Sequence, residues 1–99
     1  MFIAIVSNII DQKKWEEAGK KIGPMVEEGR LPKGLNALLF LPSTDGRKAV
    51  SVWEADSAEY LKRFLEPLSN GAVRAEYFQI NTEHAYGLPL HSPQHAAAR

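Results

Sequence analysis

The stretch MFIAIVSNII, residues 1–10, decides the fold of this chain. Side chains alternate between the two faces of a strand, and here both faces are apolar. One face carries Phe2, Ala4 and Val6, and the other carries Ile3, Ile5 and Ile9. A strand of this kind must be covered on both sides. We therefore predict that residues 1–10 lie at the centre of a sheet.

The composition of the chain bounds its class and its partners. Ninety-nine residues make a single domain, and 12 Lys and Arg balance 12 Asp and Glu, so we expect no nucleic-acid partner. There is no cysteine, which excludes disulfides and Cys-ligated metals and is typical of a cytoplasmic protein. Residues 1–10 lack the basic leader of a signal peptide, and no later apolar run approaches the ~20 residues of a membrane span. We expect no membrane partner.

An amphipathic helix is predicted after the first strand. Asp11 can cap its N-terminus with a side-chain oxygen. Apolar residues then recur at the spacing of one helical face, namely Trp15, Ala18, Ile22, Met25 and Val26. Gly23-Pro24 should bend or divide this helix, because proline lacks the backbone N–H that a helix interior uses.

Two strands that pair antiparallel are expected next, over residues 35–42 and 48–55. Asp45-Gly46 lies between them and is a strong turn signal, because both residue types tolerate positive φ.

A second helix and a fourth strand complete the pattern. Asp56, three residues before Glu59, predicts the start of the helix, and Pro67 with Asn70-Gly71 predicts its end. Residues 72–81 then form the last strand, again apolar on both sides.

The resulting order is strand, helix, strand, strand, helix, strand, which predicts a ferredoxin-like α+β fold over residues 1–81. Right-handed crossovers would place the first and third strands in the middle of a four-stranded antiparallel sheet, with both helices on one face. The other face is then left bare. We expect a second copy of the chain to cover it, giving a homodimer; the alternative is partial cover by residues 82–99, which form an extended or partner-contacting tail.

At this point the chain resembles a known group of proteins. The element order, with Val52-Trp53-Glu54 ending the third strand and an acidic residue opening the second helix, is similar to the dimeric α+β barrel superfamily. That superfamily includes antibiotic-biosynthesis-monooxygenase-like proteins and heme-degrading monooxygenases. The resemblance covers residues 1–81 and implies a homodimer whose two sheets face each other.

The resemblance also implies candidate site residues. In the monooxygenase relatives an Asn on the first strand and a Trp on the third line the cavity between sheet and helices, and Asn8 and Trp53 are similar by position. A carboxamide can hydrogen-bond an oxygenated substrate, and an indole can stack on a planar ring. Tyr77 is a further substrate-binding candidate and His84 a further catalytic one. The alternative is that Asn8 satisfies a local turn and Trp53 belongs to the core.

No cofactor is expected. The heme-degrading relatives ligate iron through a His on the second helix, and residues 56–70 contain none. Tyrosine ligates iron in other heme proteins, but we interpret Tyr60 as an aromatic at the helix surface or the edge of the core. His91 and His95 have a helical spacing, yet Pro93 lies between them and no acidic residue follows, so we expect no metal site.

Three functions remain open from the sequence. The first is a homodimer that binds a small, largely apolar organic ligand between sheet and helices. The second is a cofactor-independent monooxygenase or isomerase acting on a planar phenolic or quinone-like substrate. The third is a structural interaction module without a ligand.

Overall fold

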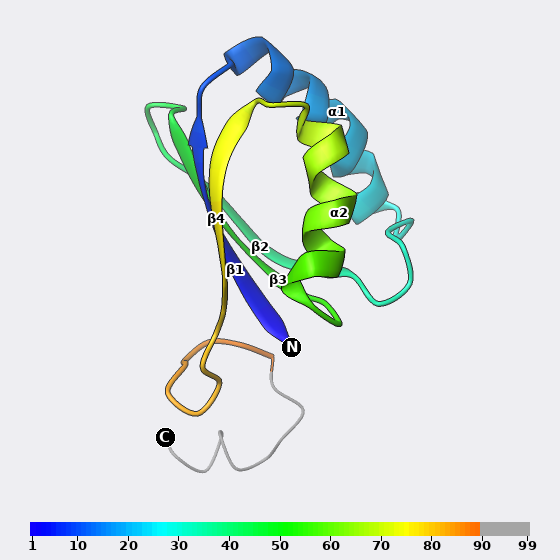
Figure 1. The fold of residues 1–99 in the computed structure, drawn as a ribbon, viewed down its shortest axis with the longest axis vertical. Coiled ribbons are helices and arrows are strands. Elements are labelled where there is room, and N and C mark those ends of the chain that lie inside the picture. The colour runs from blue at the N-terminus through cyan, green and yellow to red at the C-terminus, as the bar shows by residue number, and fades with distance from the viewer. Residues whose placement is uncertain (90–99) are drawn as a thin grey trace.

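The structure of the chain is a computed structural model, and it describes residues 1–89. The elements are, in order, β1 (Phe2–Ile9), α1 (Gln12–Glu27), β2 (Asn36–Pro42), β3 (Lys48–Glu54), α2 (Ala58–Ser69) and β4 (Val73–Gln79). The four strands form an antiparallel sheet in the order β2-β3-β1-β4. Both helices lie on one side of this sheet (Figure 1). The predicted ferredoxin-like α+β fold is confirmed.

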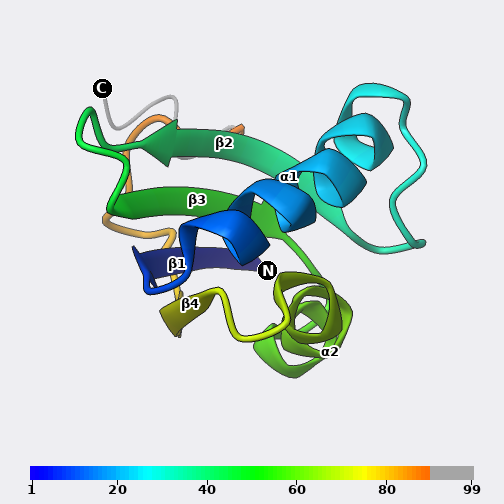
Figure 2. The same ribbon diagram turned by 90° about the horizontal axis from the view of Figure 1, so that it is seen from above.

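The central position of β1 is also confirmed. β1 pairs with β3 on one side and with β4 on the other, so that Ile3 stands opposite Trp53 and Ile5 stands opposite Tyr77. These side chains point toward the helices and join one apolar core, whose buried members are Ile3, Ile5, Leu35, Trp53, Ala55, Leu61 and Leu65. Seen from above, the strands lie side by side with α1 crossing them diagonally (Figure 2).

The helix α1 begins as the sequence predicts but is not divided. The Asp11 carboxylate accepts a hydrogen bond from the backbone N–H of Lys14 at 3.0 Å, which is an N-cap. The helix then continues through Pro24 to Glu27. Because Pro24 lies in the last turn, it removes only one internal hydrogen bond, and the backbone N–H of Glu28 still donates to the Pro24 carbonyl. The prediction of a divided helix was therefore wrong.

The helix α2 begins one residue later than predicted and ends, as predicted, at Asn70-Gly71. Its N-cap is Ser57, whose hydroxyl oxygen accepts from the N–H of Tyr60 at 3.0 Å, so the assignment of Asp56 as the cap was wrong. Pro67 does not end the helix, which continues to Ser69 and stops where Asn70 adopts the left-handed conformation.

The Asp56 carboxylate instead lies against the backbone at Gly34. Gly34 has a φ of +86°, and a Cβ built on it would lie 2.9 Å from Oδ2 of Asp56. Only glycine fits both the backbone conformation and the close approach. The loop before β2 is thereby packed against the start of α2.

The turn between β2 and β3 forms at the predicted place. Gly46 takes positive φ, whereas Asp45 does not. The Asp45 carboxylate accepts hydrogen bonds from the Ser43 hydroxyl at 2.7 Å and from the Arg47 N–H at 3.0 Å. The Ser43 hydrogen bond is the main cause that lowers the pKa of Asp45. The side chain, rather than a second positive φ, organises this turn.

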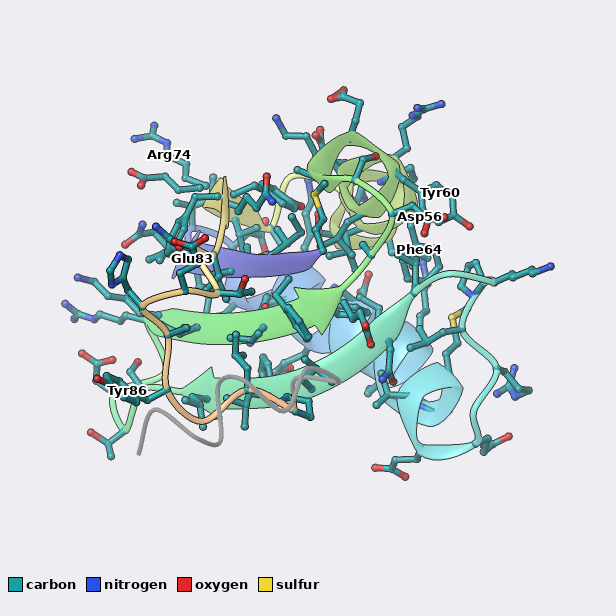
Figure 3. The ribbon with its side chains drawn as sticks, turned by 90° about the horizontal axis from the view of Figure 1, so that it is seen from below. Asp56, Tyr60, Phe64, Arg74, Glu83 and Tyr86 are labelled. Atoms are coloured by element: carbon teal, nitrogen blue, oxygen red, sulfur yellow. The ribbon has the colours of Figure 1, made fainter. Side chains whose placement is uncertain are left out.

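The face of the sheet turned away from the helices carries the alternate side chains of every strand. Phe2, Ala4 and Val52 are buried on it, whereas the side chains nearer the edges are exposed. The described part of the chain after β4 turns to the side of the sheet away from the helices, and seen from below it passes in front of β3 and β2 (Figures 1 and 3).

Candidate functional site

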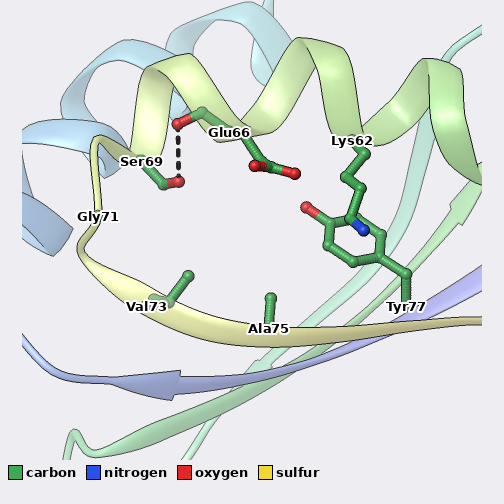
Figure 4. Close-up of a pocket in the computed structure, with 7 residues that line it drawn as sticks. All are labelled: Lys62, Glu66, Ser69, Gly71, Val73, Ala75 and Tyr77. Atoms are coloured by element: carbon green, nitrogen blue, oxygen red, sulfur yellow. Dashed lines mark hydrogen bonds between the residues drawn. The ribbon is translucent and has the colours of Figure 1, made fainter.

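A cleft lies between α2 and the edge strand β4. Its volume is about 200 Å³. The residues that line it come from both elements and from the turn between them: Lys62, Glu66, Ser69, Gly71, Val73, Ala75 and Tyr77. Figure 4 shows the helix as the roof of this cleft and the strand as its floor. The cleft therefore lies at one edge of the sheet, between β4 and the helix α2.

Small side chains keep this cleft open. The β4 residues that face α2 are Val73, Ala75 and Tyr77, and only the last of them is large. Gly71 adds no side chain where the chain turns from helix to strand. The floor of the cleft is consequently apolar and shallow.

The polar groups of the cleft gather around Tyr77. The ammonium group of Lys62 lies 5.4 Å from the centroid of the Tyr77 ring, within the range of a cation–π interaction. Burial of the ring and the nearby Glu66 carboxylate raise the pKa of Tyr77 to about 12. The phenol is therefore neutral at ordinary pH. A bound molecule would find an apolar floor and, at one end, a cation, a carboxylate and a phenol.

Trp53 belongs to the core and does not line the cleft. It is one of the buried members of the apolar core, and its indole N–H donates to the Ser51 hydroxyl at 3.1 Å. The cluster fills the space between sheet and helices at this point. This position agrees with the alternative interpretation of the sequence, in which Trp53 belongs to the core.

Asn8 lies on the opposite face of the sheet from Trp53. Trp53 pairs with Ile3, and Asn8 is five residues further along the same regular strand, so their side chains point to opposite faces. Asn8 is exposed and stands between Lys48 and Arg74 in the register of its two neighbouring strands. The structure therefore does not bring Asn8 and Trp53 together, and of the predicted residues only Tyr77 lines the cleft.

The remaining candidates lie apart from the cleft. His84 is exposed in a turn after β4, where its backbone N–H donates to the Asn81 carbonyl at 3.2 Å. The Tyr60 hydroxyl donates to the Lys33 carbonyl at 2.8 Å, and its ring packs at the edge of the core, as interpreted from the sequence. Figure 3 shows Tyr60 beside Asp56 and Phe64, far from Arg74 on β4. His91 and His95 lie outside the described residues.

A second feature is an apolar patch on the face of the sheet away from the helices. We name it the open-face patch; its members are Leu39, Leu41, Val50 and Phe78. These side chains are between 39% and 55% exposed. The strand register makes them neighbours across the buried centre of this face. Charged residues share this face: Lys48 and Glu54 lie at the two ends of β3, and Arg74 and Glu76 lie along β4.

The sequence interpretation missed the α2 side of the cleft. Lys62 and Glu66 are four residues apart on the helix. From the sequence alone, such a pair is interpreted as two solvent-exposed charges on the polar face of the helix. One available signal was Ala75, a small residue on the strand face where its neighbours on either side, Val73 and Tyr77, are larger. The small side chain of Ala75 indicates a cleft only once it is known that α2 lies over β4.

The chain matches no protein-family model and no curated protein. Residues 1–89 contain no group of three or more acidic, His or Cys side chains arranged to hold a metal ion. Nor does that part of the chain include a helix with the length and hydropathy needed to cross a membrane.

Proposed function

We propose that this chain is a homodimer that binds a small, largely apolar organic molecule in the cleft between α2 and β4. Two copies would meet through the open-face patch. The single observation that carries the proposal is the exposure of this patch on the face of the sheet that the chain's own helices do not cover.

The patch has the composition of an interface. A contiguous apolar surface with charged residues around it is typical of a contact between proteins. Each of the four side chains still presents about half of its surface to solvent. A second copy related by two-fold symmetry would offer the same surface, so each apolar side chain would meet another apolar side chain.

The cleft supports a ligand of limited size. Pockets for drug-sized molecules hold roughly 300–1,000 Å³, so about 200 Å³ suits a molecule near the size of one ring. Its apolar body would lie on Val73 and Ala75. Its polar group would face Lys62 and Tyr77, the first as a charged donor and the second as a neutral phenol.

Filling the cleft tests ligand binding. We expect phenol and benzoate, used as single-ring probes, to shift the amide NMR signals of β4 in the unaltered chain. Ala75→Leu should abolish these shifts because the added side chain occupies the floor. Arg74→Leu is the matched control, since it places the same leucine side chain at the neighbouring position on the other face of the strand.

Two results would count against the ligand. One is a set of shifts that Ala75→Leu leaves unchanged. The other is the absence of shifts with both probes, together with native mass spectrometry of the purified chain that finds no bound small molecule.

A further inference from the structure

The β2 edge of the sheet carries exposed apolar side chains on both of its faces. Leu39 and Leu41 belong to the open-face patch, whereas Phe40 lies on the helix side of the sheet. The Phe40 ring is 58% exposed although its centroid lies 6.0 Å from that of Trp15 on α1. Pairing of two copies through the open-face patch would cover the two leucines and leave Phe40 in water. The exposure of Phe40 therefore needs a separate explanation.

This edge lacks the usual protection of a free strand. Edge strands are commonly guarded against pairing by charged side chains and proline. The other edge strand, β4, carries Arg74 and Glu76, whereas β2 contains no charged residue at all. Its guards are Pro42 at the last position and an irregularity in the register between Ala37 and Leu39 near its start. Of the two edges, β2 is the one suited to accept another strand.

The backbone of Phe40 also points outward. The Ser43 N–H donates to the Lys48 carbonyl at 2.8 Å, so these two residues form a hydrogen-bonded pair. Such pairs alternate along an antiparallel ladder, which directs the N–H and C=O of Leu41 toward β3 and those of Phe40 away from it. Pro42 also points away from β3. In an antiparallel pairing centred on Phe40 it would stand opposite Leu38 of the second copy, where it offers a carbonyl acceptor but no N–H donor.

We propose that β2 pairs antiparallel with β2 of a second copy, about a two-fold axis through Phe40. In this register Phe40 stands opposite the partner's Phe40, with the reciprocal backbone hydrogen bonds that both can make. Leu39 stands opposite the partner's Leu41, so apolar side chains meet on both faces and no like charges meet. The strand is self-complementary in this register.

The arrangement of the helices is compatible with this pairing. The helix α1 crosses the sheet diagonally and passes the β2 edge near the end where that strand begins (Figure 2). Phe40 lies in the other half of the strand. Pairing of β2 with a partner's β4 would instead place Arg74 and Glu76 against an apolar strand and would leave further edges open, giving an unclosed chain of copies. Self-pairing of β2 closes after two copies.

This inference uses a different surface from the proposed face dimer and does not depend on it. If both contacts form and their two-fold axes cross at right angles, the assembly closes at four chains. If only one forms, it contains two chains, and the variants below tell which contact is present.

The first test is disulfide cross-linking, which the absence of cysteine makes clean. Cα atoms of a directly opposed hydrogen-bonded pair lie about 5.5 Å apart. That spacing is within the ~4.4–6.8 Å that a disulfide spans. We expect Phe40→Cys to form a covalent dimer on mild oxidation that reduction reverses. Thr44→Cys, an exposed control in the following turn, should stay monomeric on a denaturing gel. Equal cross-linking of the two variants would overturn the proposal.

The second test measures the mass of the assembly by sedimentation. We expect Phe40→Lys to halve the mass of the wild-type assembly while circular dichroism shows an unchanged fold, since the side chain is already exposed. Val50→Lys, on the open-face patch, tests the face dimer separately. A wild-type mass for Phe40→Lys overturns edge pairing whatever Val50→Lys does, and a wild-type mass for Val50→Lys overturns only the face dimer.

Discussion

Replacing Phe78 by alanine removes the aromatic member of the open-face patch and should weaken the face dimer. The side chain is 51% exposed, so about half of its burial remains to be gained on association. Full burial of such a side chain stabilises by roughly 1.5–3 kcal/mol, which leaves ~1 kcal/mol in each copy. Two copies lose ~2 kcal/mol together. At 1.4 kcal/mol for each factor of ten, the dissociation constant should rise about 30-fold.

Sedimentation equilibrium over a range of concentrations measures this constant. Ile10→Ala is the matched control, because Ile10 is 59% exposed but precedes α1 and lies outside the patch. Its dissociation constant should equal that of the unaltered chain. The reasoning is refuted if the unaltered chain sediments at its monomer mass of 11.0 kDa at every concentration. It is equally refuted if the two variants associate alike.

Three further changes test the fold and the cleft. Gly34→Ala should lower the free energy of unfolding by about 1–3 kcal/mol, because φ is positive and the new Cβ meets the Asp56 carboxylate. Urea unfolding measures this loss, and an unchanged free energy of unfolding would contradict the close approach of Asp56 to Gly34. Leu61→Ala should cost about 2–5 kcal/mol in the same assay, since Leu61 is fully buried in the core, whereas a cost typical of a surface site would mean that the core is misplaced. Tyr77 should ionise near pH 12 in an ultraviolet titration, and Tyr77→Phe should remove that late step. Because the folded-state pKa lies above the unfolded value of 10.0, the stabilising effect is complete below pH 10 and is lost as the pH rises toward 12. Ionisation of Tyr77 near pH 10 would contradict the described burial.

The fold was predictable because its signals are local. The apolar residues on both faces of β1 predicted a central strand. The helical spacing of the apolar residues before β2 and after β3 predicted the two helices that cover the sheet. The errors are also local. Asp56 and Ser57 are both good caps, and only the contact of Asp56 with Gly34 decides between them.

The candidate site was predictable only in part because it depends on which face each strand residue occupies. Positions along the strands suggested that Asn8 and Trp53 meet, but the β1–β3 register puts them on opposite faces. The register decides which alternate residues of each strand face the helices, because a shift of one residue moves every side chain to the other face. The cleft is harder still to predict from the sequence, because it arises from the spacing between α2 and the small side chains of β4.

The position of β1 in the sheet has a consequence for how the chain is made. β1 is synthesised before the other elements, yet its two neighbours come at residues 48–54 and 73–79. Its apolar side chains therefore cannot be sheltered on the ribosome until nearly the whole domain has emerged, and closing contacts so distant in sequence is slow. During that interval the nascent chain presents an apolar strand whose two partner strands have not yet formed, which gives a chaperone reason to bind it.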